Sequence, residues 1–275
     1  MMNKLPVILL AILLSACAQT TLQPVMVAKK IFQVNADPKF ISEHSTGDYR
    51  GSPSGRDLPA DMQRSFLLLQ QRDESSTVAL NLRQGNLIAD KYLFFTKDSG
   101  SWKLAGIGTP TLARLHVRKL RSMQALSPAA LDSTLREAQQ YADPEYKTKE
   151  EFDFIVNSLQ LKLAPDDTLI AHFNKYRPAF DSLLTAARQA LQHPHDEYNS
   201  LVNTKTPVYR PLLISNISTG GFLPEQCIDF HILYDQVGYL YTPDEKYLPE
   251  LRPDKVMMLR KLGKGWYLYK VAIYL

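Results

Sequence analysis

The chain has 275 residues, of which 45% are hydrophobic and 22% are charged. This balance is typical of a globular protein with a buried core, and it excludes a chain that is disordered along its length. The 32 basic and 28 acidic residues give a formal net charge of +4, which is too small to indicate a nucleic-acid partner. No apolar run approaches the roughly 20 residues that a helix needs to cross a bilayer, so no membrane-spanning helix is predicted.

The N-terminal residues have the layout of an export signal. Lys4 supplies a positive charge, Leu5 to Leu14 form an apolar segment, and the small residues Ser15 and Ala16 precede Cys17. At about 1.5 Å per residue, a helix of roughly ten residues is too short to cross the hydrocarbon core. We therefore predict that residues 1–16 are a signal peptide that is cleaved off.

The tetrapeptide Leu14-Ser15-Ala16-Cys17 resembles the lipobox of bacterial lipoproteins. The resemblance implies that the Cys17 thiol receives a diacylglycerol, that cleavage occurs before this residue, and that the new amino group is acylated, with palmitate as the expected chain. Because the next residue is Ala18 rather than Asp, it also implies the outer membrane of a Gram-negative cell, with the protein facing the periplasm. The alternative is an ordinary cleavable signal with an incidental cysteine.

The other cysteine is Cys227. If Cys17 is lipidated, one thiol remains, and it cannot form an intrachain disulfide. We therefore expect packing alone to hold the fold together, although the predicted compartment is oxidising.

The first half of the mature chain is predicted to be a tether followed by a β-rich lobe. Residues 17–30 show little periodicity and are interpreted as the lipid tether. Residues 31–125 form the predicted N-terminal β-rich lobe. Its expected elements are a first strand at Ile31–Val34, a long polar loop at Glu43–Asp61, strands at Val78–Leu82, Leu87–Phe95 and Trp102–Ile107, and a helix at Thr111–Met123.

Residues 126–275 are predicted to contain a helical segment and a second antiparallel sheet. Ser127-Pro128 is typical of a helix start, Thr148 to Glu151 fits a capping box, and Pro178 predicts a kink or two successive helices. The expected strands are Leu212–Ile217, Gln226–Tyr234, Gly238–Tyr241, Lys255–Leu262 and Trp266–Leu275. The predicted fold class is α+β, with antiparallel sheets, a central helical segment and two lobes divided near residue 125.

A second resemblance lies in the helical segment. Leu169-Ile170, His172-Phe173, Arg177, Phe180 and Leu183 are similar to a segment of about twenty residues found in bacterial lipoproteins that are themselves uncharacterised. The resemblance implies no particular activity. Arg177 is a candidate binding residue, and the alternative is a surface or interface ion-pair donor.

Two clusters carry side chains that could perform catalysis or bind metal. Cys227, Asp229 and His231 resemble a nucleophile set, but on one strand the cysteine and histidine would lie about 13 Å apart, so half burial explains them better. His193, His195, Asp196 and Glu197 include metal-ligand types in a spacing that matches no defined site, so a solvated loop is favoured.

Two further groups point to binding. Basic side chains near the first predicted helix could contact anionic lipid or polysaccharide, or simply be solvated: Arg114, His116, Arg118, Lys119 and Arg121. Tyrosines crowd the C-terminal strands, where they either line a groove for a glycan or a protein, or simply favour strand structure. The candidate binding residues among them are Tyr239, Tyr241, Tyr267 and Tyr269.

The sequence lacks GxSxG, HExxH, SxxK and Gly-rich phosphate-loop motifs. We therefore assign no catalytic residue, metal or cofactor, and predict a non-catalytic, lipid-anchored binding or accessory protein of the periplasm. Its expected partners are membrane lipid through Cys17 and an envelope protein or glycan. The alternative is an envelope hydrolase with an unrecognised site, in the Glu43–Asp61 or the His193–Glu197 loop.

Overall fold

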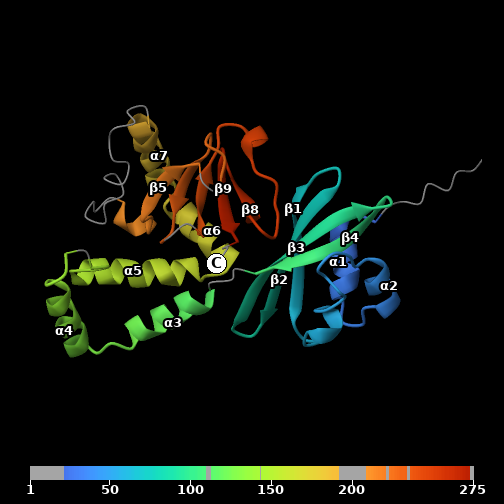
Figure 1. The fold of residues 1–275 in the computed structure, drawn as a ribbon, viewed down its shortest axis with the longest axis horizontal. Coiled ribbons are helices and arrows are strands. Elements are labelled where there is room, and N and C mark those ends of the chain that lie inside the picture. Colours follow the sequence, from blue (N-terminus) through green and yellow to red (C-terminus); the bar gives the residue numbers. More distant parts are fainter. Residues whose placement is uncertain are drawn as a thin grey trace, which may run out of the picture.

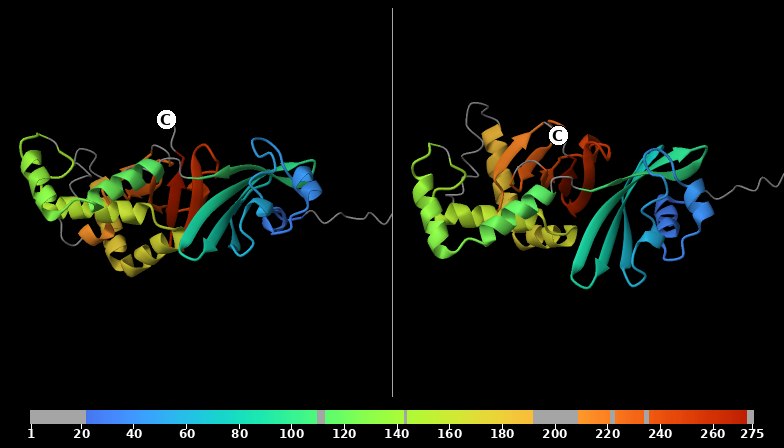
Figure 2. Two further views of the ribbon diagram at one scale, coloured as in Figure 1. Left: turned by 90° about the horizontal axis from the view of Figure 1, so that it is seen from below. Right: turned by 60° about the horizontal axis from the view of Figure 1, so that its bottom comes forward.

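The computed structural model describes residues 22–109, 113–142, 144–191, 209–220, 223–233 and 236–272. These residues form helices and two antiparallel sheets, which confirms the α+β class. Each sheet belongs to one of two lobes that lie side by side and give the molecule an elongated shape (Figure 1, Figure 2). Among the described helices, none combines the length and apolar character that crossing a membrane requires.

The first sheet is a meander of β1 (Gln63–Gln71), β2 (Ser75–Gln84), β3 (Leu87–Asp98) and β4 (Ser101–Gly108), in that order. Gly85 and Gly100 have positive φ angles in the two hairpin turns after β2 and β3, a conformation that glycine adopts without strain. Side chains alternate between the faces, so Leu93 and Phe95 point to one core and Tyr92 to another. The three strands predicted in this lobe after residue 77 are therefore present, with longer bounds.

Helix α1 (Pro24–Phe32) covers the outer face of this sheet (Figure 1). Val27 and Ile31 are buried there in one apolar cluster with Leu80 and Leu93 of the sheet. Two expectations are thus wrong, because residues 24–30 belong to a packed helix rather than to a tether, and Ile31–Val34 is not a strand. The buried residues recur at helical spacing, and Pro24 starts the helix where a missing N–H costs nothing. A short helix, α2 (Pro38–Glu43), follows.

The helical layer consists of α3 (Ala113–Gln124), α4 (Pro128–Ala138), α5 (Lys149–Lys162), α6 (Asp166–Lys175) and α7 (Arg177–Leu191). The Ser127 hydroxyl caps α4, and Thr148 with Glu151 forms the predicted capping box on α5. The predicted break near Pro178 separates α6 from α7. Met123 of α3 lies in one apolar cluster with Phe152 of α5, so α3 packs with the second lobe rather than with the N-terminal lobe to which residues 31–125 were expected to belong.

The second sheet has the order β5-β6-β7-β9-β8. Its strands are β5 (Asn216–Thr219), β6 (Ile228–His231), β7 (Val237–Tyr241), β8 (Val256–Gly263) and β9 (Trp266–Val271). Aromatic side chains join it to α6 and α7, with the ring centroids of Phe173 and Tyr239 5.1 Å apart and those of Phe180 and Tyr239 4.9 Å apart. This packing explains why so many tyrosines occur in the sheet.

The lobes share a core. Tyr92 and Phe94, on the inner face of the first sheet, join the apolar cluster of the second lobe. At the same contact, the buried Lys270 ammonium lies 2.6 Å from the Asp166 carboxylate, which also accepts a 3.0 Å hydrogen bond from the Tyr92 hydroxyl. Asp90 accepts from the backbone N–H of Asp166 at 2.8 Å. These contacts fix the lobes in one arrangement.

Candidate functional site

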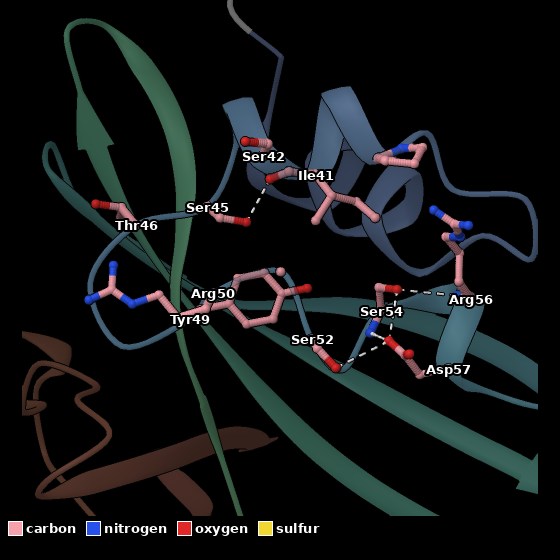
Figure 3. A pocket seen from close by; sticks show the side chains of 12 residues that line it. Ile41, Ser42, Ser45, Thr46, Tyr49, Arg50, Ser52, Ser54, Arg56 and Asp57 are labelled. Atoms are coloured by element: carbon pink, nitrogen blue, oxygen red, sulfur yellow. Dashed lines mark hydrogen bonds between the residues drawn. The ribbon is translucent and has the colours of Figure 1, made fainter.

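An open cavity of about 670 Å³ lies in the N-terminal lobe, between α2 and the segment that follows it (Figure 3). We call it the α2 cavity. Its lining combines a small apolar wall with hydroxyls and two arginines: Pro38, Ile41, Ser42, Ser45, Thr46, Tyr49, Arg50, Gly51, Ser52, Ser54, Arg56 and Asp57. Its volume is in the range of small-ligand sites.

Helix α2 and the edge of the sheet build the first wall. The Asp37 carboxylate caps α2 by accepting a 3.0 Å hydrogen bond from the N–H of Lys39. Where α2 ends, the Ser45 hydroxyl donates to the carbonyl of Ile41 at 2.6 Å. Ser45 also bridges to Leu104 of β4, and the N–H of Thr46 donates to the Leu104 carbonyl at 2.9 Å. The wall therefore has a fixed backbone.

The opposite wall is organised by the Asp57 carboxylate. It accepts a 2.7 Å hydrogen bond from the N–H of Ser54 and a 3.0 Å bond from the Ser54 hydroxyl, in a capping box (Figure 3). These bonds lower the pKa of Asp57, so it stays ionised. A Cβ on Gly55 would lie 2.0 Å from the carbonyl oxygen of Gln33, so only glycine lets this wall pack against the end of α1.

Tyr49 forms the floor between the walls. Its hydroxyl donates to the carbonyl of Pro53 at 3.0 Å. Burial, with a smaller contribution from the Asp57 charge, raises the pKa of Tyr49 to about 12. Tyr49 is therefore neutral at physiological pH and adds no charge to the cavity.

Arg50 and Arg56 are exposed, and they lie on opposite sides of the view in Figure 3. Within the described ranges, neither guanidinium donates a hydrogen bond or forms an ion pair, although Arg56 contributes to lowering the pKa of Asp57. Guanidinium groups bind carboxylates and phosphates through paired donors. The cavity thus offers two uncommitted anion-binding groups with hydroxyls between them.

The predicted tyrosine groove is not present on the described surface. Tyr239 and Tyr269 are fully buried and Tyr267 is 4% exposed, so these residues belong to the core. Tyr241 is half-buried, and the Arg188 guanidinium lies 4.5 Å from its ring centroid. The expectation was wrong because strand preference, the alternative interpretation, accounts for the tyrosines.

Arg177 is committed to structure rather than poised for a ligand. Its guanidinium donates to the carbonyls of Leu262 and Gly263 at 3.3 and 3.2 Å and pairs with Asp181. It also lies over the Phe173 ring, 5.0 Å from its centroid. Arg177 therefore ties the start of α7 to the turn between β8 and β9, as the ion-pair alternative predicts.

Cys227 and His231 do not meet. The pKa of the buried thiol is raised by desolvation, and its sulfur lies 3.9 Å from the carbonyl oxygen of Tyr247. His231 instead contacts Ser218 and Tyr269, which sequence reasoning missed because they come from other strands. Their Oγ and OH atoms lie 2.7 and 3.0 Å from the two ring nitrogens.

Several predicted positions give no site in the part of the chain that the structure describes. Cys17 and the His193–Glu197 cluster lie outside it. Of the basic group, His116 is buried and its Nε2 lies 2.9 Å from Oε1 of Gln236, while Lys119 pairs with Glu145. Among the described residues, no cluster of three His, Cys, Asp or Glu side chains has the arrangement of a metal site.

Comparison of the chain with models of known protein families, with curated proteins and with solved structures finds no match.

Proposed function

We propose that this protein is a lipid-anchored binding protein of the bacterial envelope, attached to the outer membrane through acylated Cys17 and facing the periplasm. We further propose that the α2 cavity binds an acidic segment of an envelope glycan. The observation that carries the second proposal is the pair of uncommitted guanidinium groups at a hydroxyl-lined cavity.

The lining favours a glycan over a protein partner. Sugar hydroxyls need many donors and acceptors, which Ser42, Ser45 and Thr46 supply. Carboxylates on the glycan would pair with the guanidinium groups of Arg50 and Arg56. A protein partner instead typically uses a broad surface with an apolar centre, which this concave polar site lacks.

The anchor would hold this cavity close to the membrane. Leu22 packs against the core of the N-terminal lobe, and it lies only five residue steps along the chain from Cys17. A fully extended chain of that length spans at most about 18 Å. A lipid on Cys17 would therefore keep the N-terminal lobe at the membrane surface, where the inner envelope polymers begin.

The anchor is tested by Cys17→Ser in the full chain. We expect the variant to lose lipid attachment and to leave the membrane fraction after washing with high salt and carbonate. Retention of the variant in that fraction, together with a native N-terminus that is not acylated, would refute the anchor.

Glycan binding is tested with the full-length protein in detergent, titrated with acidic oligosaccharides of increasing length. Each charge-assisted contact contributes about 1.5–3 kcal/mol, so Arg50→Gln and Arg56→Gln should each weaken binding about tenfold or more. Arg136→Gln is the matched control, because Arg136 is exposed on α4 in the other lobe. Equal affinity in all four proteins, or no binding at all, would contradict the proposal.

A further inference from the structure

Four polar side chains gather on one face of the second sheet, away from the α2 cavity. Ser218 of β5 is half-buried, and Asp229, His231 and Tyr269 are buried. We call them the Ser218 cluster. From their geometry we infer that the second lobe carries a serine nucleophile that hydrolyses carboxylic esters, an activity that goes beyond the proposed binding role and does not depend on it.

Strand pairing brings the cluster together. Ser218 lies directly opposite Asp229, and His231 is two residues further along the same face of β6. The Ser218 hydroxyl therefore reaches diagonally to His231, with Oγ 2.7 Å from Nε2. This is the separation of a nucleophile and its general base.

A glycine lets a third group orient the base. His231 lies opposite Gly238 of β7, and Gly238 lies opposite Tyr269 of β9. A Cβ at Gly238 would lie 2.7 Å from the Tyr269 hydroxyl, so the missing side chain leaves the space in which that hydroxyl lies 3.0 Å from Nδ1 of His231. When Nδ1 carries the proton and donates to Tyr269, the lone pair of Nε2 faces Ser218 and can take its proton.

Asp229 supplies the charge that this chemistry requires. Its Oδ2 atom lies 3.5 Å from Nε2 of His231, so a carboxylate lies beside the nitrogen that takes the proton. Proton transfer from Ser218 turns His231 into an imidazolium, which a buried carboxylate at this distance stabilises. Tyr269 is a positioning residue, since it acts through His231 rather than on the substrate.

Access and reaction follow from the placement of Ser218. β5 is an edge strand, and Ser218 is the member of the cluster that is partly open to solvent.

The reaction has two steps. In the first step, Oγ of Ser218 attacks the ester carbonyl, the hydroxyl proton passes to Nε2 of His231 and then to the departing alcohol, and an acyl-serine forms. In the second step, water attacks the acyl carbon, Nε2 takes its proton and returns it to Oγ, and the acid is released.

The test uses the full-length protein in detergent with a fluorophosphonate probe, which releases fluoride as it bonds to an activated serine oxygen. We expect mass mapping to find the label on Ser218, and we expect hydrolysis of p-nitrophenyl acetate to be lost in Ser218→Ala. Because general bases contribute about 10²- to 10⁴-fold, His231→Gln should slow labelling by at least a hundredfold. Tyr269→Phe should shift the pH profile of labelling, a change that lost packing alone would not produce.

Ser133→Ala is the control, because Ser133 is a half-buried serine on α4, distant from the cluster in the fold. It should label like the wild type. The decisive result comes from the unmodified protein, so misfolding of a buried variant cannot obscure it. The inference is overturned if the folded wild type stays unlabelled at Ser218. It is also overturned if the wild type and His231→Gln are labelled at the same rate.

Discussion

The contact between the lobes and the α2 cavity both gather charged and hydroxyl side chains, but they use them differently. At the contact, Asp166 and Lys270 are buried, and the carboxylate has a cation and a hydroxyl donor within hydrogen-bond distance. In the cavity, Arg50 and Arg56 are exposed, and neither guanidinium has such a partner within the described ranges. Charges that satisfy one another stabilise an arrangement, whereas uncommitted charges around a cavity are available to a ligand.

The largest expected effect on stability comes from removing the buried Asp166–Lys270 ion pair beside the contact. Lys270→Met leaves the Asp166 carboxylate buried without its cation, which should lower the free energy of unfolding by about 3–5 kcal/mol in denaturant titrations. Adding Asp166→Asn should recover much of this loss, because no buried charge remains. If Lys270→Met alone changes stability by less than about 1 kcal/mol, the buried ion pair beside the contact does not stabilise the fold.

A second variant tests the sheet beneath the Ser218 cluster. Gly238→Ala would place a Cβ 2.3 Å from the carbonyl oxygen of Phe230, so we expect a loss of about 1–3 kcal/mol from overpacking. Gly106→Ala is the matched strand control, since an added Cβ there meets no atom within 4 Å. Similar melting temperatures for both variants would show that β7 does not approach β6 this closely at Gly238.

Arg177 sharpens the distinction between structural and ligand-binding arginines. Arg177→Met removes donors to two backbone carbonyls, so we expect unfolding to become easier by about 1–2 kcal/mol while affinity for acidic oligosaccharides is unchanged. Arg50→Gln should show the reverse pattern. If Arg177→Met instead binds acidic oligosaccharides more weakly and is as stable as the wild type, Arg177 is a binding residue rather than a structural one.

The smallest effect is a pH dependence in the wall of the cavity. Because the folded-state pKa of Asp57 is lowered, its ionised form stabilises the fold at neutral pH, and this stabilisation is lost as the pH falls below 3.8 toward the lowered value. The Tm difference between the wild type and D57N should therefore be present at pH 7 and shrink in acid. A difference that is constant with pH would contradict this role of Asp57.

Local signals in the sequence predicted local structure well. The helix start at Ser127-Pro128, the capping box at Thr148 and the break near Pro178 are all present, because each depends on a few adjacent residues. The helix at Pro24–Phe32 was missed because a short amphipathic helix after a polar stretch has a weak pattern. Its stability comes from burial of Val27 and Ile31 against a sheet that is distant in sequence.

The candidate sites were only partly predictable for the same reason. The polar segment Glu43–Asp61 was identified as a candidate region, and the α2 cavity lies along it. The Ser218 cluster could not be found, because it depends on which strands pair and on the gap at Gly238. The tyrosines gave a misleading signal, since their side chains are equally suited to a core and to a binding surface.

The most direct test of the proposed binding role places a photo-crosslinking residue at Ser42, which is exposed at the α2 cavity, in the full chain expressed in its own envelope. The same residue at Gln140, exposed beyond α4, serves as the control. We predict that Ser42 alone captures an acidic envelope glycan and that Arg50→Gln reduces the yield. Capture of only a protein, or of the same material from both positions, would contradict glycan binding by the α2 cavity.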